Sequence, residues 1–235
     1  MSSWMTAFPS AWDVVGFVLF VLVFPGYHLF YLWAVRRLRG RTARGRFDVL
    51  RESWIQRILD TGDVTMAAQQ TRNLTMVSSI LVSSSLILLG VTGNLLVQMP
   101  TLERAIPHPT TWDLHPGAMR FKLYLLIFTF VLAFSFCMTA LRHLGNFILL
   151  IGADPALVEE HIGPPVKYFA GLINRASHRY TLGVRSFYAA FPLFVWLFDS
   201  RLFVALTLFW GLKFTFFQDF SGDRSKMGDT DELDD

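Results

Sequence analysis

The sequence has few of the residues on which soluble, disulfide-bonded or metal-binding proteins depend. Charged residues are 17% of its 235 residues, against about 25% in soluble domains, and 53% are hydrophobic. Its one cysteine, Cys137, excludes an intrachain disulfide. None of its histidines form the i, i+4 pair of a zinc-protease helix. We therefore expect a chain that lies mostly in a lipid bilayer and holds no metal or cofactor.

Sequence signatures of catalysis are also missing. There is no Gly-rich phosphate loop, no Gly-x-Ser-x-Gly elbow and no kinase-like set of residues. Ser83, Ser84 and Ser85 have no Asp and His in an order that favours a catalytic triad, so we interpret them as packing residues. We expect that the protein is not an enzyme.

Long apolar stretches dominate the sequence. Three of them cover residues 14–35, 74–97 and 121–151, and each is long enough to cross a bilayer. A fourth contains Asp199 and Arg201 and is either one long helix or a hairpin of two spans, 180–198 and 202–220, with its turn at these charges. We favour the hairpin. Residues 1–221 are then a single all-α, multi-spanning transmembrane bundle of about five spans, with four as the alternative, and residues 222–235 are a disordered acidic tail.

Turn-forming residues punctuate these stretches. A kink is expected at Pro25-Gly26, a break at Gly62, and a helix end at Pro100. Asp63 is expected to cap the second span, and Asp154-Pro155 to begin a short helix. A further short helix over 166–179 is expected before the last apolar stretch.

The distribution of charge predicts an orientation. Residues 36–72 contain nine Arg and four acids, whereas residues 99–119 contain one Arg and two acids. The positive-inside rule places 36–72 in the cytoplasm and the N-terminus outside, in the inner membrane if the cell is prokaryotic. Leu50, Trp54, Ile58 and Leu59 recur at helical spacing and predict an amphipathic helix on the cytoplasmic surface. Acids interrupt the basic cluster, so we expect no nucleic-acid partner.

Several short motifs resemble a known family. They are Trp54, Gln69, Arg72 and Asn73; Phe121-Lys122, Phe134, Phe136, Arg142 and Asn146; and Gly183, Arg185, Tyr188, Pro192, Trp196 and Phe198. Their order and spacing resemble the membrane-protein family called domain of unknown function 599, over about residues 14–220. That family tends to have Gly-Pro where this chain has Asp199-Ser200, and a turn there supports the hairpin. The resemblance implies a small multi-spanning helical protein without an assigned reaction.

Cations and amides gather at the predicted inner ends of the spans. Arg142 and Asn146 are four residues apart and share a helix face. If the faces of the three spans meet, Arg72, Arg142 and Arg185 form one cationic pocket, and guanidinium groups pair well with phosphate or carboxylate. The alternative is that they anchor helix ends by reaching lipid phosphates separately. The predicted anion- or lipid-binding residues are Gln69, Arg72, Asn73, Arg142, Asn146 and Arg185.

Two classes of function follow from this site. The first is a small-anion channel or transporter, or a protein that binds anionic membrane lipids. The second is a non-enzymatic accessory subunit of a larger membrane complex. The serines of the second span would let helices approach closely, so we expect a homo-oligomer or a subunit of a complex.

Overall fold

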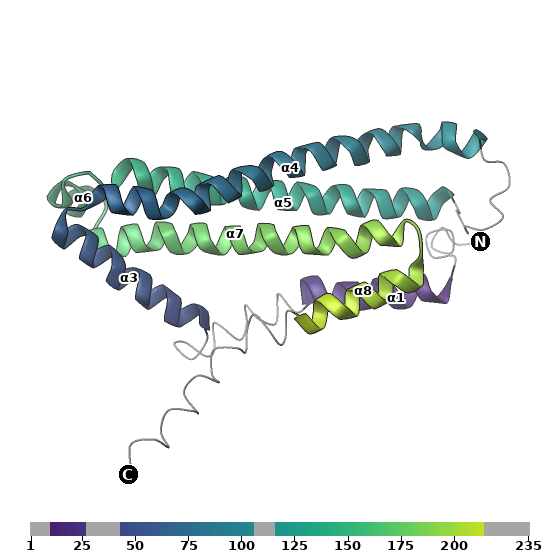
Figure 1. The fold of residues 1–235 in the computed structure, drawn as a ribbon, viewed down its shortest axis with the longest axis horizontal. Coiled ribbons are helices and arrows are strands. Elements are labelled where there is room, and N and C mark those ends of the chain that lie inside the picture. Colours follow the sequence, from purple (N-terminus) through teal and green to yellow (C-terminus); the bar gives the residue numbers. More distant parts are fainter. Residues whose placement is uncertain (1–9, 27–42, 106–115, 214–235) are drawn as a thin grey trace, which may run out of the picture.

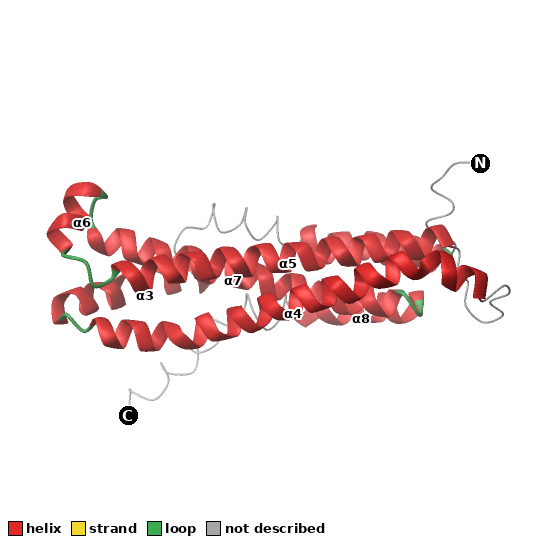
Figure 2. Ribbon diagram, turned by 90° about the horizontal axis from the view of Figure 1, so that it is seen from above, coloured by secondary structure: helices red, strands yellow, loops and turns green. Residues whose placement is uncertain are grey.

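The computed structural model describes residues 10–26, 43–105 and 116–213, and every element in these ranges is a helix (Figures 1 and 2). Three long helices run side by side in alternating directions: α4 (Val64–Ala105), α5 (Pro116–Leu150) and α7 (Pro165–Trp196). The short helix α6 (Pro155–His161) connects α5 to α7 at one end, which we call the α6 end. The prediction of an all-α fold is confirmed.

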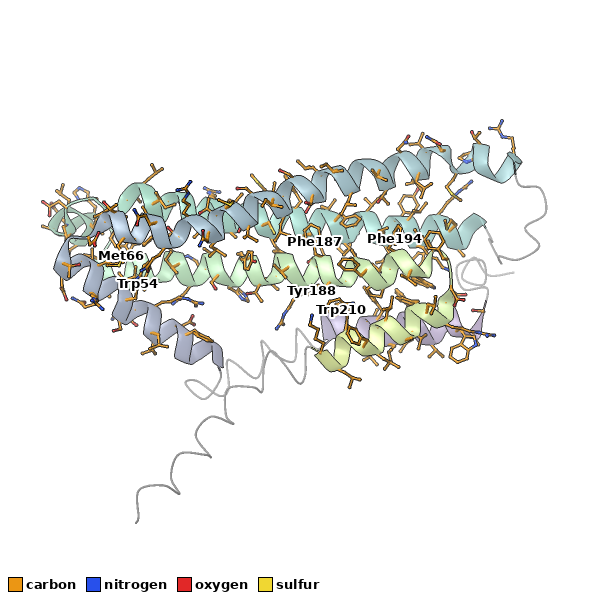
Figure 3. The ribbon with its side chains drawn as sticks, viewed as in Figure 1. Trp54, Met66, Phe187, Tyr188, Phe194 and Trp210 are labelled. Atoms are coloured by element: carbon orange, nitrogen blue, oxygen red, sulfur yellow. The ribbon has the colours of Figure 1, made fainter. Side chains whose placement is uncertain are left out.

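Shorter helices cover the two halves of α7. Near the α6 end it packs against α3 (Ala43–Thr61). The other half meets α8 (Ser200–Lys213), which lies beside α1 (Ala11–Val21) and its π-helical continuation η1 (Leu22–Gly26). Figure 3 labels Trp54 of α3, whose ring is 6.2 Å from that of Phe147 of α5, and Tyr188 of α7, which stacks on Trp210 of α8 at 4.5 Å.

The central helix is α5. From Leu123 onward, its buried apolar residues are spaced alternately three and four apart, an average period of 3.5 that is typical of coiled-coil packing. They are Leu123, Leu126, Phe130, Ala133, Cys137, Ala140, Leu144 and Phe147, followed by Ile151 just beyond the helix. The helix α4, which packs against α5, has a buried residue at every seventh position: Thr71, Ser78, Ser85, Thr92 and Met99.

Two hydrophobic cores lie at opposite ends of the bundle. The core at the α6 end includes Ile55, Ile58, Leu144, Phe147 and Phe169. The other includes Phe20, Leu123, Leu193, Trp196 and Phe203. Between them α5 and α7 approach so closely that a Cβ on Gly183 would collide with the Sγ of Cys137, which explains the glycine.

Two of the described helices are long and apolar enough to cross a membrane, over Val64–Thr101 and Gly117–Leu150. Only 11% of the most apolar stretch of the first is buried in the protein, against 39% in the second. Side chains such as Ile80, Ile87 and Val91 of α4 face outward. A count of five spans remains a prediction.

Most of the predicted helix boundaries are found. Gly62 has φ +70° between α3 and α4, and the Asp63 carboxylate accepts the Met66 N–H at 2.9 Å. The Asp154 carboxylate accepts the Ala156 N–H at 2.9 Å and caps α6.

The hairpin prediction concerns the last apolar stretch. Its break is confirmed because α7 ends at Trp196 and α8 begins at Ser200. The Asp199 carboxylate accepts the N–H groups of Arg201 at 2.6 Å and Leu202 at 3.1 Å, so it caps α8.

Two boundary predictions are wrong. Pro100 does not end α4, which continues to Ala105, because a proline this close to a helix end removes only one of the few remaining backbone hydrogen bonds. The predicted helix 166–179 and span 180–198 are one helix, α7, because no proline lies near residue 180 to interrupt its hydrogen bonds. Parts of the predicted first span, outer loop and last span, and the tail 222–235, lie outside the described residues.

Candidate functional site

The long helices carry an unbalanced set of charges. Together α4, α5 and α7 contain nine Arg and Lys residues and one acid, Glu103 near the end of α4. The sequences of α5 and α7 contain no Asp or Glu. An arginine in the middle of either helix therefore has no carboxylate on its own helix to pair with.

Contacts between helices show which residues share a level along the bundle. The close approach of Gly183 to Cys137 places Arg142 level with His178, because α5 and α7 are antiparallel. A Cβ on Gly152 would lie 3.6 Å from Val64, which places Arg72 of α4 near the level of Leu144. At 1.5 Å per residue, Arg185 lies about 10 Å from the level of Arg142, toward the opposite end of the bundle.

The structure thus brings some predicted site residues to one level and separates others. Five of the six are exposed at the half of the bundle nearer the α6 end: Gln69, Arg72, Asn73, Arg142 and Asn146. Arg185 is half-buried at the middle of α7. Their joint binding of an anion stays a prediction.

Three arginines of α5 and α7 influence His143 electrostatically. The imidazole of His143 lies within electrostatic reach of three guanidinium groups, those of Arg142 on α5 and of Arg175 and Arg179 on α7. In the described part of the chain, the structure records no ion pair for any of these arginines. We call Arg142, His143, Arg175 and Arg179 the α5–α7 cationic cluster.

The two arginines of α7 extend in different directions. The Nη1 atom of Arg175 lies 3.5 Å from where a Cβ of Gly171 would be, so its side chain folds back one turn toward the α6 end. The guanidinium carbon of Arg179 lies 5.9 Å from the ring centre of Phe136, across the α5–α7 boundary. A cation near an aromatic ring is a favourable contact that leaves the outer N–H groups available.

Arg51 has a different, structural role. Its guanidinium donates to Asp48 at 3.1 Å, to Asn174 at 3.2 Å and to Ser177 at 3.0 Å. These bonds tie α3 to the face of α7 that carries Asn174 and Ser177.

Guanidinium groups remain charged at all physiological pH values and repel one another at short range. The Arg175 side chain extends toward Gly171 and the Arg179 guanidinium toward Phe136, so the three positive charges are spread along the α5–α7 boundary. Among the described residues, His, Cys, Asp and Glu form no group of three that could hold a metal ion.

Sequence reasoning missed Arg175 and Arg179 because residues 166–179 were assigned to a separate helix outside the bundle. Their spacing of four residues was a usable signal, since it puts both on one face of any helix that contains them.

A buried polar network, which we call the Asp13 node, lies at the other end of the bundle. Asp13 is 2% exposed, and its Oδ1 accepts hydrogen bonds from Trp196 Nε1 and Ser200 Oγ, both at 2.6 Å. Lys122 Nζ lies 3.1 Å from the same oxygen, donates to the Trp196 carbonyl at 3.1 Å and lies 4.9 Å from the Trp196 ring centre. The other carboxylate oxygen accepts from Ser10 Oγ at 2.7 Å.

The Asp13 node is saturated by protein donors and joins α1, α5, α7 and α8, so we interpret it as structural. Sequence reasoning did not select Asp13 or Lys122 as a pair. Only the folded chain brings these residues, 109 positions apart in the sequence, together.

Comparison with known proteins gives a family without a described activity. No protein of curated function and no solved structure matches the chain significantly. The family described as protein of unknown function, DUF599, matches residues 15–222, and because this is most of the sequence the chain belongs to that family.

Proposed function

We propose that the chain is an integral membrane protein that binds anionic lipid headgroups or small anions at the α5–α7 cationic cluster. The membrane part of the proposal depends mainly on α4. A helix of a soluble core buries most of its apolar residues, but only 11% of the apolar stretch of α4 is buried. A lipid environment accounts for the outward-facing side chains of Ile80, Ile87 and Val91.

The proposed orientation puts the α6 end in the cytoplasm. Arg72 and Arg142 each lie eight residues, about 12 Å, from the α6-end terminus of their helix, where a guanidinium meets lipid phosphates. The excess of Arg over acids in 36–72 supports the same side. Arg201, exposed after the α7–α8 turn, would then face outward.

Labelling tests this orientation. An Arg201→Cys variant in a Cys137→Ser background should react with a membrane-impermeant thiol reagent from the outside of intact cells. Labelling only after the cytoplasmic side is opened would reverse the orientation. Extraction of the protein from membranes by alkaline carbonate would contradict integral insertion itself.

The observation that supports anion binding is that Arg142, Arg175 and Arg179 all influence His143 electrostatically, while neither α5 nor α7 carries a carboxylate. Fork-shaped guanidinium groups can donate two parallel hydrogen bonds to a phosphate or carboxylate.

Lipid retention is the direct test. The full chain, purified in mild detergent from membranes of known composition, should retain anionic lipid, and Arg142→Ala should lower that amount. Arg57→Ala is the matched control, because Arg57 is an exposed arginine on α3 near the same end. Arg142→Lys should restore part of the loss, since lysine keeps the charge without the fork. Equal retention by all four proteins would reject the site.

Anion flux separates the two forms of this proposal. Chloride-loaded vesicles containing the protein should lose chloride faster than empty vesicles if the site belongs to a channel or transporter. Retention of lipid without flux would assign the cluster to lipid binding alone.

The outward face of α4 favours a second candidate, in which the chain is a non-enzymatic subunit of a homo-oligomer or of a larger complex. Glycine lowers helix stability, yet a Cβ on Gly90 would meet nothing within 4 Å in this chain. Gly90 and the exposed Ser83 leave room for a neighbouring helix. Purification in mild detergent should give either a defined homo-oligomer or stoichiometric partner subunits, and a monomer would exclude this candidate.

A further inference from the structure

We propose that α4 pairs in parallel with the α4 helix of a second copy of this chain, through a row of residues on its outward side. This inference rests on the proposed membrane insertion and orientation, and it names the partner and the contact surface of the second candidate function. It is supported by the spacing of the row, by the residues that occupy it and by the common orientation of the copies.

The buried residues of α4 show where this row lies. They recur at every seventh position on the side that packs against α5. In a seven-residue repeat, the opposite side of the helix is marked by residues spaced alternately four and three apart. All such residues on α4 are exposed, and we call them the outward row: Gln69, Asn73, Met76, Ile80, Ser83, Ile87, Gly90, Asn94 and Val97. Figures 1 and 2 show α4 at the edge of the bundle, so α5 covers one side of it and no described helix covers the other.

The outward row has the residue pattern of a two-stranded coiled coil. Every second member of the row occupies the position called a in such a repeat: Asn73, Ile80, Ile87 and Asn94. In parallel dimers β-branched Ile is favoured at a, and a polar Asn at a fixes the register and the number of strands. The row therefore matches a parallel pair of helices.

Small residues lie in the middle of the row, where two helices would come closest. Ser83 and Gly90 are seven residues apart, and a Cβ on Gly90 would meet nothing within 4 Å. Packing within one copy thus gives no reason for a glycine here, although glycine is a poor helix former. Small residues let the backbones of two membrane helices approach closely. A mobile acyl chain conforms to any surface and needs no such space, so the row favours a helix over lipid.

The polar residues of the row indicate that the partner is a second copy. The row contains no charged residue, so no pattern of charge selects a different protein. An amide has donors and an acceptor and can therefore bond to an identical amide. The Asn94 Oδ1 accepts from Gln98 at 3.1 Å, and the Asn94 N–H groups can donate across to the copy. In a parallel pair each amide meets its own equivalent at the same level.

The distribution of charge makes the pairing parallel. The excess of Arg over acids in residues 36–72, compared with 99–119, puts the same end of every copy in the cytoplasm. Asn73 and Asn94 are 21 positions apart, about 32 Å along the helix, which matches the thickness of the hydrocarbon core. One amide pair therefore lies near each boundary of the membrane, and only apolar and small members of the row lie between them.

The row is large enough for a specific contact. From Gln69 to Val97 it is about 42 Å long, and with its flanking positions it covers a strip about 14 Å wide on a helix of about 11 Å diameter. Two such strips bury about 1,200 Å² in total, which reaches the range of specific protein interfaces. This surface is open in the single chain, where Ile87 is 66% and Val97 78% exposed.

Disulfide cross-linking in native membranes tests the pairing. In a Cys137→Ser background, four single variants of the row should each form a covalent dimer on oxidation with copper phenanthroline: Ile80→Cys, Ser83→Cys, Ile87→Cys and Gly90→Cys. Leu88→Cys is the matched control, because Leu88 is exposed at the same depth as Ile87 but lies off the row. It should stay monomeric.

An amide variant tests the register. In mild detergent Asn94→Leu should raise the dissociation constant of the dimer about threefold, the size expected from the loss of one hydrogen bond between membrane helices. Asn94→Gln keeps an amide and should restore part of the loss. Gln56→Leu, which removes an exposed amide of α3, should leave the constant unchanged. Analytical ultracentrifugation measures the constant, and an equal value for Asn94→Leu and the unmodified chain would overturn the amide pairing.

The failures are distinguishable. A disulfide at Ser83→Cys alone would indicate an antiparallel pair that crosses there, and would overturn the parallel one. An oligomer that no row variant cross-links would overturn this inference and leave the second candidate function intact. Cross-links to a different protein would overturn the choice of a second copy. A monomer in mild detergent and in membranes would refute the second candidate function itself, while lipid retention still tests the first.

Discussion

Removal of the Asp13 carboxylate should destabilise the bundle strongly. In the folded protein Asp13 is 2% exposed and the Lys122 side chain 11% exposed, so both charges lie away from water. The variant Asp13→Ala leaves the Lys122 ammonium with only the carbonyl and ring of Trp196, and leaves the Trp196 indole N–H and Ser200 hydroxyl without this acceptor. Breaking a buried pair from one side costs about 3–5 kcal/mol, and we expect a loss of this size.

Equilibrium unfolding in mixed micelles with increasing sodium dodecyl sulfate, followed by tryptophan fluorescence, measures the loss. Asp199→Ala is the control, because it removes an exposed helix cap worth about 1 kcal/mol. In the double variant Asp13→Ala/Lys122→Met the isolated charge is gone, so much of the stability should return. A cost of Asp13→Ala below about 1 kcal/mol, or a double variant less stable than the single one, would refute the reasoning.

Three further predictions concern packing and caps. Gly183→Val should lower stability by about 1–3 kcal/mol in the same assay, because any Cβ there collides with Cys137, and an unchanged midpoint would show that α5 and α7 are farther apart. Gly90→Leu should convert an oligomer to monomers, as measured by light scattering in mild detergent, if a second α4 packs there; an unchanged mass argues against that face. Asp154→Ala should cost about 1 kcal/mol through the lost cap of α6, and faster amide exchange confined to α6 is the expected signature.

Local rules predicted the helix boundaries well. Gly62 with φ +70° and the caps at Asp63 and Asp154 depend only on residues within four positions, so the sequence was sufficient for them. Pro100 was misjudged because the effect of a proline depends on how many hydrogen bonds follow it, and the true end of α4 at Ala105 was not visible in the pattern.

The candidate site was predictable only in part. Arg142 was selected for its position at the end of an apolar run, and the structure adds Arg175 and Arg179 because α7 is continuous across residue 180. The level of Arg185 could not be read from the sequence, since it depends on the register that Gly183 and Cys137 set between two antiparallel helices.

The separation of the two hydrophobic cores has a consequence for the order in which the chain can fold. The core at the α6 end ends with Ala176, so all of its residues have been synthesised before α8 exists. The other core requires Phe20 of α1 to meet Phe203 of α8, whose rings lie 5.9 Å apart across 183 positions of sequence. We therefore expect that α1, the first described helix to be synthesised, has no parallel neighbour to pack against until α8, the last described helix, has been made.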